Sequence, residues 1–284
     1  MRALCARWAP HIPCVIGVES VFNLWTLSSE AATILAFAII AASILAVIIV
    51  VSRRRAQAQE DELKQAASAR GWTFQTSSEN GYRVQRWTGT TEGISWVAES
   101  LRQTSTGKKS SNRKRHISRW QCTFSPGVSG PIVCMGVPKG KEPAAGSGVQ
   151  GDGFFVQLAQ KAASFAFGHA LGTYFGDGSV KGIDASTMHR VEAQKVPGFI
   201  VMAADKDEGA RILEQGFGRA LTDATSDKSS VLSDENRPWI LIRPDAIAMA
   251  RMELHRTATD VEQFVHAGVA LTRVFTFGHR LNTD

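Results

Sequence analysis

The stretch AATILAFAIIAASILAVIIVV, residues 31–51, contains no charged side chain and decides how the rest of the chain is arranged. In a helix that rises about 1.5 Å per residue, a segment of this length spans the roughly 30 Å hydrocarbon core of a bilayer. Twelve of its residues are Ile, Leu, Val or Phe, and each of these favours insertion by about 0.3 to 0.6 kcal/mol. We therefore predict a single transmembrane helix over residues 31–52.

The basic residues that flank this segment predict its orientation. Arg53, Arg54 and Arg55 follow it directly, whereas residues 11–30 contain no Lys or Arg. Because positively charged flanks stay in the cytoplasm, the N-terminus should lie outside and the remainder of the chain inside the cell. A cleaved signal peptide is the alternative, since Ala-Gln-Ala at residues 56–58 resembles a cleavage site. The length of the apolar stretch and the arginines before that site favour the uncleaved helix.

The composition is that of a globular protein with one added apolar segment. Of the 284 residues, 44% are hydrophobic and 20% are charged, which argues against disorder over the whole length. The net charge of +6 is too modest to predict a nucleic-acid partner by itself. Residues 56–284 are numerous enough to bury a core without disulfides or metals.

The four cysteines predict no metal site. Cys5, Cys14, Cys122 and Cys134 show neither CxxC spacing nor histidine partners at zinc-finger intervals. Cys122 and Cys134 lie in two neighbouring predicted strands, where they could face each other. In the cytoplasm they should stay reduced and serve as small core residues.

The residues after the apolar stretch predict an α+β domain, built from a mostly antiparallel β-sheet with packed helices. Short segments rich in aromatic and β-branched residues indicate a meander, and its clearest hairpin turns at residues 90–93. This hairpin should bring Trp87 and Trp96 close to a cross-strand pair. The expected parts are a short external segment (1–30), the transmembrane helix (31–52), a basic flank with a juxtamembrane helix ending at Gly71 (53–71), a β-meander (72–137), a linker or loop (138–153), and helices and hairpins that complete the domain (154–284).

Residues 154–175 form a strongly apolar stretch in the last of these parts. At this length a second membrane crossing is the alternative, but Lys161 and the two glutamines Gln157 and Gln160 oppose it. We therefore predict a helix that is buried or lies on the surface of the domain.

Two later helices carry start signals in the sequence. A helix over residues 206–225 should be capped by Asp205, with Glu208 as the partner in a capping box. A last helix should begin at Thr259 with Glu262 as its box partner. Between them, strands at 239–242 and 246–252 should form a hairpin. The apolar stripe of the last helix consists of Val261, Phe264, Val265, Gly268 and Leu271.

The densest basic run is the candidate binding site. Lys108, Lys109, Arg113, Lys114 and Arg115 are interleaved with Ser and Asn and fit the tip of a hairpin. Near an anionic bilayer, each basic residue adds about 1 kcal/mol of attraction. The same charges could attract nucleic acid or an acidic partner, and a solvated loop without a partner is the remaining alternative.

Other motifs favour structural roles. Residues 146–151, GSGVQG, match GxGxxG, but they do not follow a buried strand of a βαβ unit, so nucleotide binding is not predicted. Glu262 and His266, with His255 and Asp260 nearby, could in principle hold a metal, but an exposed pair one helical turn apart is favoured.

An enzyme with dispersed site residues is the alternative function class. No nucleophile elbow, P-loop or HExxH motif accompanies the isolated His169 and His189. Such an enzyme would need a deep pocket that collects several of His169, His189, His255 and nearby carboxylates.

Two segments, AASARGWTF at residues 66–74 and GFIVMAADKDEGARIL at residues 198–213, resemble bacterial membrane proteins classed as domains of unknown function. In those proteins a membrane helix precedes an ARGW helix end, a β-meander, and an F-x-V-x-x-x-D segment that leads into a helix. Here Phe199, Val201 and Asp205 carry the second pattern. The resemblance implies a bacterial inner-membrane protein and no assigned activity, cofactor or site residue.

From these observations we expect a membrane-tethered cytoplasmic interaction or scaffold module. Its expected partners are the bilayer, through the transmembrane helix, and anionic lipid headgroups or a protein, through the basic run. No cofactor or metal is expected, and nucleic acid is not the favoured partner.

Overall fold

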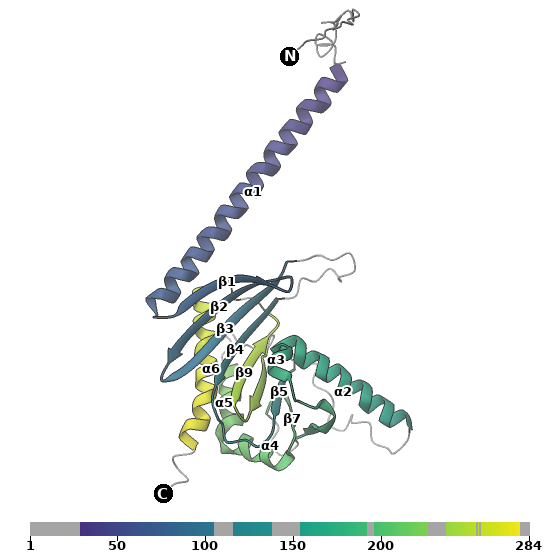
Figure 1. The fold of residues 1–284 in the computed structure, drawn as a ribbon, viewed down its shortest axis with the longest axis vertical. Coiled ribbons are helices and arrows are strands. Elements are labelled where there is room, and N and C mark those ends of the chain that lie inside the picture. Colours follow the sequence, from purple (N-terminus) through teal and green to yellow (C-terminus); the bar gives the residue numbers. More distant parts are fainter. Residues whose placement is uncertain are drawn as a thin grey trace, which may run out of the picture. The chain divides into compact units, whose positions relative to one another are not determined.

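The computed structural model describes residues 29–104, 116–137, 154–191, 196–226, 237–253, 255 and 257–278 (Figure 1). The chain divides into two compact units, Met1–Gln59 and Glu60–Asp284. The basic run, the GxGxxG match and residues 1–28 of the expected external segment 1–30 lie outside the described residues.

Helix α1, Ser29–Ala69, supplies the described part of the first unit and the start of the second. Its residues 33–59 are exposed, including Ile34 at 69% and Phe37 at 68%. Among the described residues, α1 is the one helix that is long and apolar enough to cross a membrane. The helix continues through the three arginines and ends before Gly71, as predicted.

The second unit is built on one nine-stranded sheet in which every neighbouring pair is antiparallel. The strand order is β1-β2-β3-β4-β9-β8-β5-β7-β6. This confirms the predicted α+β class. The strands are β1 Thr73–Glu79, β2 Tyr82–Thr91, β3 Ile94–Gln103, β4 His116–Thr123, β5 Ile132–Gly136, β6 His189–Arg190, β7 Phe199–Ala203, β8 Trp239–Arg243 and β9 Ala246–Arg251.

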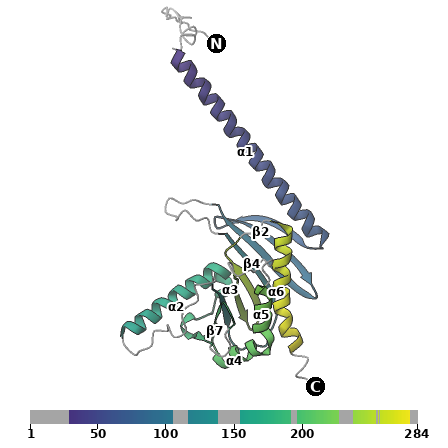
Figure 2. The ribbon, with the colours of Figure 1, turned by 180° about the vertical axis from the view of Figure 1, so that it is seen from behind.

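Helices pack on both faces of this sheet (Figures 1 and 2). One face buries α6 in a core that contains Trp87, Trp120 and Phe264, and the end of α1 adds Leu63 and Ala67 to the same core. The other face buries the end of α2. The helices of this unit are α2 Phe154–Phe175, α3 Asp177–Val180, a 3-10 turn Ala185–Thr187, α4 Lys206–Ile212, a π-helical turn Leu213–Phe217, α5 Gly218–Ser226 and α6 Ala258–Gly278.

Two tight turns set the register of the first three strands. Asn80-Gly81 and Glu92-Gly93 are two-residue turns in which both residues have positive φ, between 50° and 80°. These are the dihedrals of type I′ turns, whose twist matches that of the flanking strands. Trp87 pairs with Ala98 and Trp96 with Gly89, so the two tryptophans are diagonal neighbours on one face, close to a cross-strand pair as predicted.

The strands that carry the two core cysteines are not neighbours in the sheet, contrary to the prediction. Cys122 lies in β4 and Cys134 in β5, and the β8–β9 hairpin inserts between these strands. Both are free, buried thiols, which confirms their interpretation as small core residues. Complete burial raises the pKa of the Cys134 thiol to about 12, so it stays protonated at neutral pH.

Helix α4 starts as predicted, but its capping box does not close. Asp205 accepts hydrogen bonds from the backbone N–H groups of Asp207 and Glu208 at 2.9 and 3.1 Å. The Glu208 carboxylate turns away from the cap and accepts hydrogen bonds from Ser129 and Gly130. The predicted helix does not continue regularly after Ile212. A π-helical turn follows, and within it Gly216 has a φ of 105°.

Helix α6 begins at Ala258, one residue before the predicted start, and its capping box consists of other residues than predicted. Thr257 and Asp260 exchange hydrogen bonds of 3.0 and 3.1 Å between their side chains and backbone N–H groups. Glu262, the predicted partner, is bonded to Arg70 at the end of α1 at 2.5 Å. The predicted apolar stripe of α6 is buried in full.

Candidate functional site

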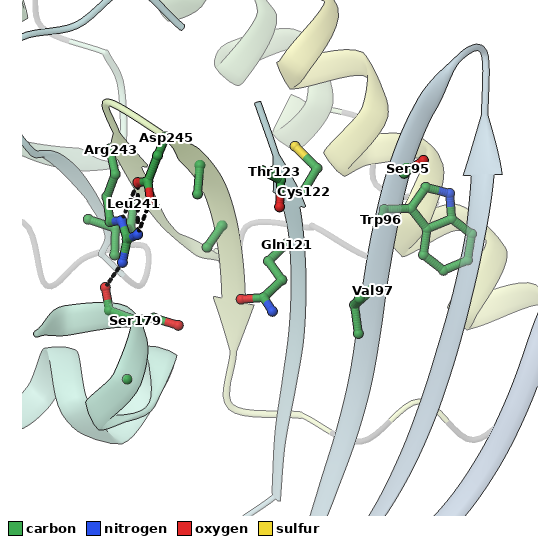
Figure 3. A pocket seen from close by; sticks show the side chains of 13 residues that line it. Ser95, Trp96, Val97, Gln121, Cys122, Thr123, Ser179, Leu241, Arg243 and Asp245 are labelled. Carbon is green, nitrogen blue, oxygen red and sulfur yellow. Dashed lines mark hydrogen bonds and ion pairs between the residues drawn. The ribbon is translucent and has the colours of Figure 1, made fainter. Parts of the chain in front are cut away.

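A groove of about 420 Å³ lies on the α2 face of the sheet, where β3, β4, β9 and β8 run side by side (Figure 3). Its floor is a cross-strand row: Val97 pairs with Gln121, Gln121 with Ala248, and Ala248 with Leu241. Alternate residues of a strand point to the same face, so this row is set by the register of the four strands. Ser95 and Thr123 add hydroxyl groups at one end.

One wall of the groove carries a satisfied charge pair. Arg243 donates three hydrogen bonds of 2.6 to 2.9 Å to the Asp245 carboxylate and one of 2.8 Å to the backbone oxygen of Ser179 in α3. The hydrogen bonds from Arg243 lower the pKa of the Asp245 carboxyl. The two charges therefore compensate each other on the groove wall.

The chemistry of the lining favours binding over catalysis. The Cys122 sulfur lies 3.5 Å from the Thr272 hydroxyl of α6, on the opposite side of the sheet from the floor. Burial raises the pKa of this thiol, so it is not an activated nucleophile. Gln121 and Thr123 are exposed and can donate and accept hydrogen bonds beside an apolar floor. The groove suits a neutral ligand or an uncharged segment of a partner.

The predicted histidines do not meet in this groove. His169 and His189 are exposed, whereas His255 is 2% exposed and packs on Phe264 at 4.5 Å between ring centroids. None of the three lines the groove. This groove therefore does not collect the histidines that the dispersed-site enzyme hypothesis needs.

The residues weighed as metal ligands form a pair on α6. Glu262 and His266 lie one helical turn apart as predicted, with oxygen and nitrogen 3.9 Å apart, but Glu262 is half-buried and not exposed. The same carboxylate is held by Arg70, whose hydrogen bond lowers the pKa of Glu262. No group of three potential ligands occurs within the described residues.

The predicted binding residues Lys108, Lys109, Arg113, Lys114 and Arg115 all fall outside the described residues. The strands on either side of them are described. Strands β3 and β4 pair antiparallel, with Arg102 opposite His116.

Sequence reasoning missed the groove because it is made by distant pairing. The floor depends on Gln121 of β4 lying beside Ala248 of β9. No local sequence pattern in β4 or β9 predicts that the two strands pair. The missed local signal was Asn80-Gly81, a dipeptide typical of type I′ hairpins.

Comparisons with known proteins do not assign the chain to a family. No family model matches it. No curated protein matches it. A solved structure, that of the mycobacterial trehalose monomycolate transport factor A (TtfA), aligns with a TM-score of 0.42 at 6% sequence identity. The alignment covers 76% of this chain and 93% of the other. A likeness at this level carries no argument about function.

Proposed function

We propose that this protein is a membrane-tethered interaction module whose second unit, Glu60–Asp284, works at the cytoplasmic face of a bacterial inner membrane. The observation that carries this proposal is the continuity of α1. The helix contains the uncharged residues 31–51 and the three arginines, and its last turns bury Leu63 and Ala67 in the core of the domain. A membrane helix without a break before the domain is suited to a tether.

The same helix end is fastened to the last helix of the domain. Arg70 donates a hydrogen bond to Glu262 of α6, and its guanidinium lies 5.8 Å from the ring centre of Trp72. Exposed ion pairs contribute only about 0 to 1 kcal/mol. The buried Leu63 and Ala67 therefore supply most of the attachment.

The second part of the proposal concerns the inner leaflet. The basic run in the β3–β4 connection binds anionic headgroups, because the tether keeps the domain beside the bilayer. At about 1 kcal/mol per basic residue near anionic lipid, five residues together can hold the connection at the surface.

Hydrogen exchange on the full chain in nanodiscs tests this lipid contact. In discs that contain phosphatidylglycerol, the backbone amides of residues 105–115 should exchange more slowly than in discs of phosphatidylcholine alone. Changing Lys108, Lys109, Arg113, Lys114 and Arg115 to Gln should abolish the difference. Equal exchange of the wild-type segment in both lipids would overturn the lipid contact.

A control variant removes three basic residues elsewhere on the domain. Lys206, Arg211 and Arg219 are exposed residues of α4 and α5, outside the basic run. Changing these three to Gln should leave the protection of residues 105–115 intact. Loss of protection in this control would mean that total charge, and not the basic run, governs the contact.

A further inference from the structure

Helix α2 is attached to the sheet by its C-terminal end. Leu171 and Phe175 are 1% and 5% exposed and pack against the core on this face of the sheet. Tyr174 stacks on Trp239 with ring centres 4.2 Å apart and planes 5° apart. Arg119 of β4 donates hydrogen bonds of 2.7 and 3.0 Å to the backbone oxygens of Tyr174 and of the residue before it. This end of α2 is thus part of the domain core.

Ten residues before Phe175, the same helix presents an aromatic side chain to its surroundings. Phe165 is 79% exposed, which exceeds the exposure of each large apolar side chain of α1 that is described. Its neighbour Ala166 and, one turn on, His169 are exposed as well. A single exposed aromatic residue is common on soluble proteins, so exposure alone does not indicate a ligand.

The composition of α2 is the second observation. Its 22 residues contain Lys161 as the sole Lys, Arg, Asp or Glu. A helix on the water-facing surface of a globular domain normally carries charged residues on its outer side. An apolar helix with an exposed Phe is instead expected to have an apolar surrounding, either in protein or in lipid.

We propose that α2 lies in the headgroup region of the bilayer, with Phe165 inserted at the boundary of the acyl chains. This inference rests on the proposed tether, which keeps the domain beside that bilayer. The exposed His169 favours the lipid interface over a dry protein interface, because its polar ring nitrogens can reach the headgroups while the ring contacts apolar surface. A Lys and a His in the sequence of the helix disfavour a full crossing.

Nitroxide labelling of the full chain in nanodiscs of phosphatidylcholine and phosphatidylglycerol tests the proposal. The labelled variant is Phe165→Cys, made with Cys5→Ser and Cys14→Ser, while the buried Cys122 and Cys134 remain. Because Phe165 is largely exposed, its replacement should leave the fold intact. Oxygen collides with labels in lipid, whereas a water-soluble nickel chelate collides with labels in water.

Two further labelled positions provide the references. Ile40→Cys reports on the apolar stretch of α1, and Arg219→Cys, at a side chain 88% exposed on α5, reports on water. The label at residue 165 should show the high oxygen-to-nickel collision ratio of the label at residue 40. A ratio like that at residue 219, or shielding from both reagents by a protein partner or a second copy, would overturn the proposal. If the label at residue 40 itself is not in lipid, the tether fails and not this inference alone.

Discussion

At the scale of single residues, Gly268 shows how closely α6 approaches the sheet. A Cβ added there would lie 2.4 Å from the indole ring of Trp120, a side chain with 0% exposure in β4. We predict that Gly268→Ala lowers the free energy of unfolding by about 1 to 3 kcal/mol, because overpacking outweighs the gain in helix propensity. Urea unfolding measures this change.

Gly168 in α2 is the matched control for this substitution. An added Cβ there would meet Ala185 at 3.8 Å, an ordinary contact. Gly168→Ala should therefore leave stability unchanged or raise it by up to about 1 kcal/mol. Equal destabilisation by both substitutions would contradict the close packing of Gly268 on Trp120.

His255 makes the domain sensitive to acid. Burial, together with the nearby Arg251 charge, lowers the pKa of His255 to about 3 in the folded protein, whereas an unfolded histidine titrates near 6.5. Between pH 6.5 and pH 3, His255 is protonated in the unfolded chain but stays neutral in the folded chain. The contribution of the neutral His255 to the free energy of unfolding is therefore complete above pH 6.5 and is lost as the pH falls towards 3. We predict that His255 contributes a slope of about 1.4 kcal/mol per pH unit between these values.

The comparison of wild type with His255→Gln isolates this contribution. Unfolding free energies measured at pH 7 and pH 5 should differ less in the variant than in the wild type. His266→Gln, at a side chain 56% exposed, should behave like the wild type. An unchanged pH dependence in His255→Gln would show that other groups cause the acid sensitivity.

At the scale of elements, Glu208 fastens the start of α4 to the loop before β5. Its side chain is 12% exposed and accepts hydrogen bonds of 2.9 to 3.3 Å from the backbone N–H groups of Ser129 and Gly130 and from the Ser129 hydroxyl. We predict that Glu208→Ala destabilises the domain by about 1 to 3 kcal/mol, because these donors lose a charged acceptor. Glu214→Ala, at an exposed position after the helix break, should change stability by less than about 0.5 kcal/mol. A thermal or urea unfolding series that found both substitutions equally mild would contradict this role.

Elements with a strong local signal were predictable from the sequence. The cap at Asp205, the β8–β9 hairpin and the apolar stripe of α6 follow from residues close together in the chain. The partners of Glu208 and Glu262 were not predictable. Neither carboxylate caps its own helix. Glu208 accepts hydrogen bonds from Ser129, and Glu262 accepts one from Arg70, both far away in the sequence.

At the scale of the whole molecule, the class of fold was predictable and the strand order was not. Short segments rich in aromatic and β-branched residues, with a hairpin turn at residues 90–93, indicated an antiparallel sheet with helices. The placement of the β8–β9 hairpin between β4 and β5 depends on pairs such as Cys122 with Ile247. That long-range pairing separated Cys122 from Cys134 and created the groove floor, so both were beyond local reasoning.

Both proposals require that residues 31–51 stay in the chain and anchor it in a membrane. The direct measurement is the accurate mass of a C-terminally tagged chain recovered from carbonate-washed membranes of the expressing cells. The tagged chain should remain in the membrane pellet with residues 31–51 intact. Recovery in the soluble fraction, or a chain shortened by cleavage after residue 58, would contradict it.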